Sequence, residues 1–167
     1  MVTHVKVSTM FHCSLERAFK TPILCDLSKI HTGFGIIPKV THTTDNDNWG
    51  HPGSSKKVHV ARSFTQKGGF SSVDHIVERK ENDFWKIRVD NFQSWMLGFS
   101  KFEGTWKTTP QNDGKIKVDY AYRLHSKGLL LYPICWLFGN IYWRMYMKHV
   151  LNNIKELAIK KEPYFYN

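Results

Sequence analysis

Residues 58–90, VHVARSFTQKGGFSSVDHIVERKENDFWKIRVD, alternate apolar and polar side chains in short segments. Successive side chains of a β-strand point to opposite faces, so this alternation predicts strands with one buried face. Gln66–Gly69 and Glu81–Asp83 separate the segments and consist largely of residue types that turns favour. The pattern predicts an antiparallel sheet built from consecutive hairpins.

The same alternation continues on both sides of this stretch. Toward the C-terminus it runs through residues 96–108 and, after the strong hairpin turn Gln111–Gly114, through residues 116–124. Toward the N-terminus, residues 36–44 favour another strand, and residues 3–11 open the chain with the same period. We therefore expect a long antiparallel meander together with a strand at the start of the chain.

Helices are predicted near both ends of the chain. Ser14 is a favourable N-cap for a short helix that begins at Leu15 and is expected to end before Pro22, because proline breaks helices. A second short helix is expected over about residues 26–30. Over residues 147–158, apolar side chains recur every three or four positions, which predicts a long amphipathic helix that packs across the sheet.

Composition favours one packed domain and leaves several partners open. The chain has 167 residues with no internal repeat or linker-like segment, so a single domain over residues 1–167 is expected. Hydrophobic residues make up 41%, too many for a disordered chain. The 24 lysines and arginines exceed the 14 aspartates and glutamates by 10, which suits nucleic acid, an anionic membrane surface or an acidic ligand. The basic residues are scattered without a recognised nucleic-acid motif, so nucleic-acid binding is not favoured.

The cysteines and the N-terminus indicate a cytoplasmic protein. Cys13, Cys25 and Cys135 are too few and too widely spaced for a disulfide framework, so we expect reduced thiols. The first residues lack the apolar region of a secretion signal. The common nucleophile, zinc, phosphate-loop and dinucleotide motifs are absent from the sequence, and we therefore expect neither a metal nor a cofactor.

In the order of its elements, the chain resembles the START-like superfamily, also called SRPBCC, which includes lipid-transfer and polyketide cyclase/dehydrase-like domains. The resemblance is carried by six short stretches: Val5-Lys6-Val7, residues 13–19, residues 50–57, residues 58–62, Gly104-Thr105-Trp106 and residues 151–157. It implies an α+β helix-grip fold, in which a curved antiparallel sheet wraps around the long C-terminal helix and two short helices follow the first strand. It also implies an apolar cavity between sheet and helix, where family members bind hydrophobic compounds and some catalyse cyclisation or dehydration.

Seven side chains are expected to contact a ligand in such a cavity: Arg62, His75, Phe102, Trp106, Tyr120, Tyr122 and Met147. Arg62 shares the parity of the apolar side chains in residues 58–64, and an inward guanidinium needs a carboxylate or an anionic ligand because an unpaired buried charge is costly. The alternatives are an ion pair with Asp74, Asp90 or Asp119, or a bulge that turns Arg62 outward.

His75 is expected on the inner face between Val73 and Val77, where an imidazole could exchange protons near neutral pH. The phenols of Tyr120 and Tyr122 could hydrogen-bond a ligand carbonyl or hydroxyl. For each of these residues, a purely structural role is the alternative. The favoured function is binding of a small hydrophobic or amphipathic molecule; the alternative is a cyclase- or dehydratase-type enzyme in which His75 or a cavity carboxylate acts as general acid or base.

Residues 128–143 form the most apolar segment of the chain, but a proline and a glycine interrupt it and it is too short to span a bilayer. Two interpretations remain open for it. The segment is either a buried helix start that seals the cavity, or an exposed gate that touches a membrane or another partner while Arg144 and Lys148 meet lipid phosphates. The sequence indicates neither the ligand's identity nor the oligomeric state.

Overall fold

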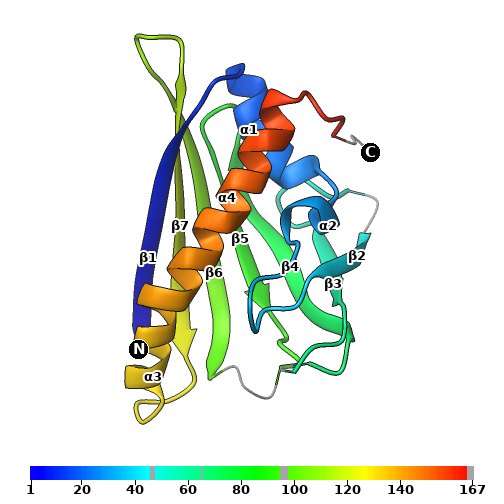
Figure 1. Ribbon diagram of the computed structural model, residues 1–167, viewed down its shortest axis with the longest axis vertical. Helices are drawn as coiled ribbons and strands as arrows, with labels where there is room; N and C mark the ends of the chain where they lie inside the picture. The colour runs from blue at the N-terminus through cyan, green and yellow to red at the C-terminus, as the bar shows by residue number, and fades with distance from the viewer. Residues whose placement is uncertain (46–47, 65, 95–97, 165–167) are drawn as a thin grey trace.

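A seven-stranded antiparallel sheet dominates the computed structural model, which describes residues 1–45, 48–64, 66–94 and 98–164 (Figure 1). Its strands are β1 (Val2–Phe11), β2 (Val40–Asp45), β3 (Ser55–Val60), β4 (Gly69–Lys80), β5 (Phe84–Asp90), β6 (Phe99–Pro110) and β7 (Ile116–Ser126). Their order in the sheet is β1-β7-β6-β5-β4-β3-β2. Each strand from β2 to β6 therefore pairs with the next along the chain, and β1 pairs with β7, which confirms the predicted meander.

Two predicted strands have different limits in the structure. Strand β2 begins at Val40 and not at Ile36, because Phe34 and Ile37 bond to each other in a tight loop before it. Strand β6 begins at Phe99; residues 95–97, which include the predicted start at Met96, lie outside the described residues.

A long helical unit crosses one face of the sheet and covers it diagonally in Figure 1. It consists of α3 (Tyr132–Leu137), the π-helical segment η1 (Phe138–Trp143) and α4 (Arg144–Ile159). The buried residues of α4 recur every three or four positions, as the sequence predicts: Tyr146, Met147, Val150, Leu151, Ile154 and Ala158. Two short helices, α1 (Leu15–Leu24) and α2 (Leu27–Ile30), follow β1, so the α+β arrangement expected from the sequence is confirmed.

Helix α1 continues through Pro22, so the prediction that it ends before this proline is wrong. Ser14 caps the helix as predicted. Proline has no N–H to donate to the carbonyl of Ala18, which lies one helical turn earlier. The indole Nε1 of Trp106 on β6 donates to that carbonyl instead, at 3.1 Å. A tertiary hydrogen bond thus replaces the missing helical one, and the helix extends across the proline.

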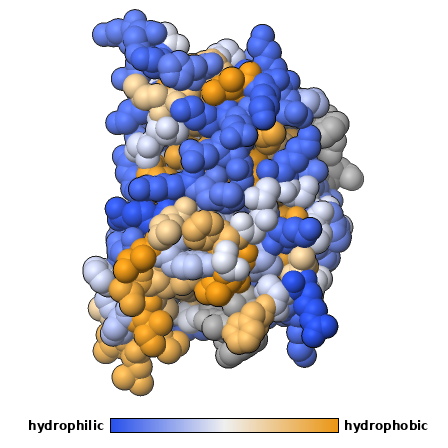
Figure 2. Space-filling view, in the orientation of Figure 1, coloured by the Kyte–Doolittle hydropathy of each residue, from blue (hydrophilic) through white to orange (hydrophobic). Residues whose placement is uncertain are grey.

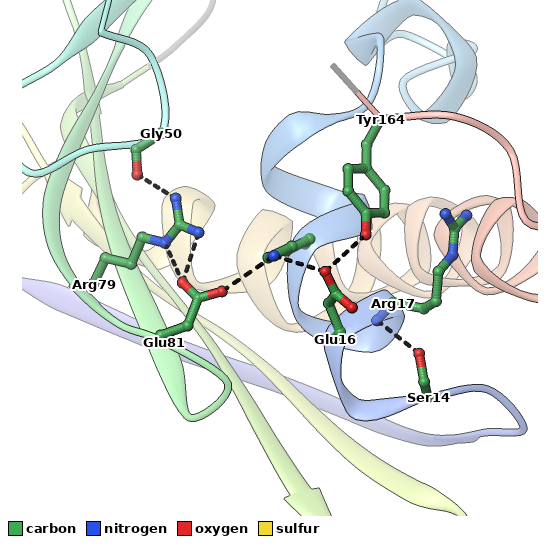
Figure 3. Close-up of polar contacts among 8 residues, drawn as sticks. Ser14, Glu16, Arg17, Gly50, Arg79, Glu81 and Tyr164 are labelled. Atoms are coloured by element: carbon green, nitrogen blue, oxygen red, sulfur yellow. Dashed lines mark hydrogen bonds and ion pairs between the residues drawn. The ribbon is translucent and has the colours of Figure 1, made fainter. Parts of the chain in front are cut away.

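A chain of polar contacts joins α1 to the β4–β5 hairpin (Figure 3). Lys20 on α1 pairs with Glu16 at 2.7 Å and with Glu81 at 3.6 Å. Glu81 in turn binds Arg79 at 2.7 Å. The Arg79 guanidinium also donates to the Gly50 carbonyl at 2.8 Å, so the same network positions the loop that leads into β3.

The bond between Trp106 and Ala18 can be tested with a double-mutant cycle. Trp106→Phe removes the donor and leaves a buried carbonyl unpaired, which costs about 1–3 kcal/mol in addition to lost packing. In Pro22→Ala, residue 22 regains an N–H for the Ala18 carbonyl, so Trp106→Phe should cost about 1 kcal/mol less in that background. Urea unfolding of the four proteins measures both costs. Equal costs in the two backgrounds would show that the indole does not substitute for the helical bond.

Candidate ligand-binding cavity

A cavity of about 730 Å³ lies between the sheet and the helices. This volume falls in the range of small-molecule sites, which is roughly 300–1,000 Å³. Most of the lining is apolar and comes from both layers, for example from Val58, Ile87, Phe102, Val150 and Ile154. The cavity is therefore bounded by the sheet on one side and by α4 on the other.

Six aromatic rings form a continuous contact chain along the cavity wall, which we call the aromatic belt: Trp85, Trp106, Tyr120, Tyr122, Trp143 and Tyr146. Centroids of successive rings are 5.1–5.9 Å apart. This spacing is typical of favourable aromatic pairs. The belt crosses from β5 through β6 and β7 to η1 and α4, so it connects the sheet to the helix beside the open space.

Four of the seven expected ligand-contacting residues line the cavity: Phe102, Trp106, Tyr120 and Tyr122. The Tyr120 hydroxyl donates to the Tyr122 hydroxyl at 3.2 Å. Burial raises the pKa of both phenols, so both stay neutral hydroxyls near neutral pH. They present polar atoms to the cavity without adding charge.

Met147 is buried but does not line the cavity. Its neighbour Tyr146 does, together with Trp143 and Val150. Consecutive residues of a helix point about 100° apart, so Met147 belongs to the adjacent buried stripe of α4. The prediction that Met147 contacts a ligand is not supported by this placement.

Arg62 does not face the cavity, so its predicted inward orientation is wrong. Strand β3 ends at Val60, and Arg62 lies exposed in the loop that follows. The alternation of residues 58–64 therefore corresponds to a strand only as far as Val60. Of the alternatives considered for Arg62, an outward side chain is the one observed.

His75 lies on the outer face of β4, so its prediction as a cavity residue is also wrong. Its Nε2 pairs with the Asp90 carboxylate at 3.1 Å. The inner face carries the opposite set of β4 side chains, Ser72, Asp74 and Ile76. Val77, expected inside, is 54% exposed. Of the two general acid/base candidates considered from the sequence, only a cavity carboxylate is present, and that carboxylate is Asp74.

Lys56 and Asp74 form the charged part of the cavity, and neither was singled out as a site residue from the sequence. They are directly opposite each other on β3 and β4, both line the cavity, and they are only 3% and 9% exposed. The Lys56 Nζ lies 3.9 Å from the centre of the Trp49 ring, a cation–π contact. Among the described residues, the Asp74 carboxylate has no hydrogen-bond or ion-pair partner.

Burial dominates the electrostatics of this pair. It raises the pKa of Asp74 to about 6, although the positive charge of Lys56 acts in the opposite direction. Burial likewise lowers the pKa of Lys56, while Asp74 opposes this effect. Both charged forms are thus held at a cost in the apolar cavity.

The polar groups of His31, Trp85 and Trp143 in the lining carry no charge near neutral pH. The His31 ring Nδ1 lies 2.5 Å from the Tyr146 hydroxyl, and burial lowers the pKa of His31 to about 4. The indole Nε1 atoms of Trp85 and Trp143 are buried without a hydrogen-bond partner in the described part of the chain. Both residues line the cavity.

The apolar segment near residue 130 is largely exposed. Eight large apolar side chains form a surface that we call the apolar cap: Leu129, Leu130, Leu131, Ile134, Trp136, Leu137, Ile141 and Met145. Figure 2 shows apolar residues gathered at the lower left, where α3 lies in Figure 1. A fully buried helix start is therefore wrong for these residues, although Cys135 and Phe138 of the same segment line the cavity.

The apolar cap and the cavity share side chains. Leu131 and Ile134 line the cavity, yet Ile134 is 70% exposed. The cavity wall therefore reaches the protein surface at the cap. Lys127, an exposed residue just before the cap, also lines the cavity.

The described residues include neither a metal-binding cluster nor a membrane-spanning helix. Across residues 1–45, 48–64, 66–94 and 98–164, His, Cys, Asp and Glu side chains form no group of three that could hold a metal ion. Over the same ranges, no helix combines the length and the apolar character needed to cross a membrane. The three cysteines are free, as the sequence predicts.

Comparison with known proteins identifies the fold. No family model matches the chain, and no curated protein sequence does. The crystal structure of Ara h 8.0201 is similar over 96% of this chain and 99% of that chain, with a TM-score of 0.69 and 15% sequence identity. The chain has the Bet v 1-like helix-grip fold. This likeness supports the helix-grip fold that the sequence resemblance implies.

The raised pKa of Asp74 predicts a specific pH dependence of stability. The folded state binds this proton more tightly than the unfolded state, because the pKa rises from 3.8 to about 6 on folding. The resulting stabilisation is complete below about pH 4 and is lost as pH rises through about 6. Asp74→Asn does not titrate, so between pH 4 and 7 it should gain up to about 3 kcal/mol relative to the unchanged protein.

Urea unfolding at a series of pH values measures this difference. Asp113→Asn is the control. The hydrogen bond from Lys115 lowers the pKa of Asp113, so Asp113→Asn should lose stability relative to the unchanged protein as pH rises, the opposite sign to Asp74→Asn. A stability difference for Asp74→Asn that does not change with pH would contradict the burial of an ionisable carboxyl at this position.

Proposed function

We propose that the protein binds a small hydrophobic or amphipathic molecule in the cavity between the sheet and the C-terminal helix. The observation that carries this proposal is an apolar cavity of about 730 Å³ with a few convergent polar groups. Protein interiors are otherwise close-packed, with few voids larger than a water molecule. A ligand that buries on the order of 300 Å² of apolar surface would gain about 8 kcal/mol before ordering costs.

Filling the cavity should weaken ligand binding. Val58 lines the cavity, so Val58→Phe places extra ring atoms inside it. Titration with Nile red, a neutral apolar dye, should show at least about tenfold weaker binding to this variant. The added ring occupies part of the cavity, so less of the dye's apolar surface can be buried there. Native mass spectrometry after mild extraction should detect a co-purifying small molecule in the unchanged protein and not in Val58→Phe.

The matched control is Val77→Phe, the same substitution at an exposed position on the outer face of β4. It should bind Nile red like the unchanged protein. Equal dye binding by all three proteins would place the dye elsewhere and contradict a ligand site in the cavity.

We also propose that the apolar cap docks on an anionic membrane surface. Eight large apolar side chains are exposed together, and Leu130 is 94% exposed. Leu137, Ile141 and Met145 are spaced four residues apart, so they share one face of the helical unit. Single exposed apolar side chains are common on protein surfaces, whereas a group of neighbouring ones is typical of an interaction site.

Charge favours a membrane as the partner. Arg144 and Lys148 flank Met145 at the C-terminal end of the cap, and Lys127 precedes the cap. The sequence from residue 127 to 155 contains no aspartate or glutamate. An apolar face bordered by cations matches interfacial helices, which bury the apolar face and leave lysine and arginine at the level of lipid phosphates. Each such cation contributes about 1 kcal/mol near an anionic surface.

Vesicle co-sedimentation tests this docking. The protein should bind vesicles of phosphatidylcholine mixed with phosphatidylglycerol more strongly than vesicles of phosphatidylcholine alone, and less strongly at high salt. Replacing Leu130 and Ile134 together by Ser should weaken binding at least about tenfold, because each inserted side chain contributes about 1.5–3 kcal/mol.

Val77→Ser is the control, because it removes an exposed apolar side chain outside the cap. Absence of vesicle binding at low salt would overturn the proposal. So would a dimer in sedimentation analysis that the Leu130 and Ile134 changes dissociate, since the cap would then be an interface between two copies of the chain.

A further inference from the structure

The positions of Lys56 and Asp74 restrict the chemistry of a ligand. Directly opposite residues of two antiparallel strands have Cβ atoms roughly 4.5–5.5 Å apart. Lys56 and Asp74 occupy such positions and both line the cavity. Within the described part of the chain they nevertheless form no ion pair, because the Lys56 ammonium lies over the Trp49 ring. A positive and a negative group thus border the same part of the cavity without neutralising each other directly.

A third group placed between them would satisfy both. It must accept a hydrogen bond from the Lys56 ammonium and donate one to the Asp74 carboxylate. A hydroxyl does both. A ligand carboxylate would meet the like charge of Asp74, and a ligand ammonium would meet the like charge of Lys56; both arrangements are unfavourable in an apolar surrounding.

We propose that Lys56 and Asp74 form a polar subsite that binds the neutral hydroxyl end of an alcohol-type amphipathic ligand. This assignment rests on the proposed binding of a ligand in the cavity and names its class. The hydrocarbon part of the ligand would lie along the aromatic belt and the aliphatic side chains of β3, β5 and α4. The hydroxyl would bridge the two strands at the buried pair.

The other groups near the pair do not supply a competing charge inside the cavity. Tyr120 and Tyr122 bond to each other, and the Tyr146 hydroxyl contacts the His31 ring. Five further titratable groups that act on the pair lie outside the cavity lining: His75 and Asp90 on the outer face, Asp45 on β2, and Cys25 and Asp26 between α1 and α2. Lys127 is the remaining charged residue of the lining, and it is exposed beside the apolar cap. Selection between charged and neutral head groups therefore falls to Lys56 and Asp74.

A matched ligand series tests this selection. Dodecanol, dodecanoate and dodecylamine carry the same hydrocarbon chain with a neutral, a negative and a positive head group at about pH 8. Each is titrated as a competitor of Nile red in the full-length protein. Dodecanol should bind at least about tenfold more tightly than either charged ligand, because a hydrogen bond between a hydroxyl and a charged group is strong.

Single substitutions should then redirect the preference. Asp74→Asn removes the negative charge, so dodecanoate should become the tightest of the three ligands. Lys56→Met removes the positive charge, so dodecylamine should become the tightest. Lys57→Met is the control: this neighbouring lysine is exposed, and its removal should leave the preference for dodecanol unchanged.

The double substitution Lys56→Met with Asp74→Leu tests the subsite in a protein that should fold even if a single substitution does not. Replacing a buried charged pair by apolar residues of similar size is commonly neutral or stabilising, so this protein should fold and should no longer distinguish the three head groups. Similar affinities for all three ligands in the unchanged protein, or preferences that no substitution alters, would overturn the subsite. Failure of Nile red and all three ligands to bind would instead overturn the proposed ligand binding itself.

Discussion

The aromatic belt is the contact on which the arrangement of sheet and helix depends. Its rings begin at Trp85 in the sheet and end at Tyr146 on α4, and each ring packs against the next in a stacked, edge-to-face or tilted arrangement. Aromatic side chains have few rotatable bonds, so a row of mutually packed rings resists collapse. We infer that the belt both attaches the helix to the sheet and keeps the space beside it open. In the same belt, Trp106 also completes helix α1 through the Ala18 carbonyl.

Alternation and helical periodicity predicted the sheet and the C-terminal helix because both patterns report one-sided burial, which the fold imposes on nearly every element. The end of α1 could not be predicted in this way. Its continuation past Pro22 depends on an indole N–H from β6, and a local rule about proline does not include distant donors. The same limit applies to Met147, since the helical period predicts a buried stripe and does not say which part of it borders a cavity.

The cavity residues show why the site was only partly predicted. Phe102, Trp106, Tyr120 and Tyr122 follow the rule that apolar and aromatic side chains face inward, and the structure places them there. On β4 the rule gave the wrong face, because a ligand cavity tolerates Ser72 and Asp74 where a packed core would not. Lys56 has the parity of Val58 and could have been found by extending that strand one step toward the N-terminus. Arg62 was wrongly predicted to face inward because the alternating pattern continues past Val60, where the strand ends.

Leu131 and Ile134 belong both to the cavity wall and to the exposed cap, and this double role bears on how a cargo would travel. A molecule leaving through these side chains into a docked bilayer would pass from one hydrocarbon environment to another without crossing bulk solvent. Its rate of transfer would then be governed by the lifetime of the protein on the lipid surface. The aqueous solubility of the molecule, which falls steeply with every added methylene, would not set the pace.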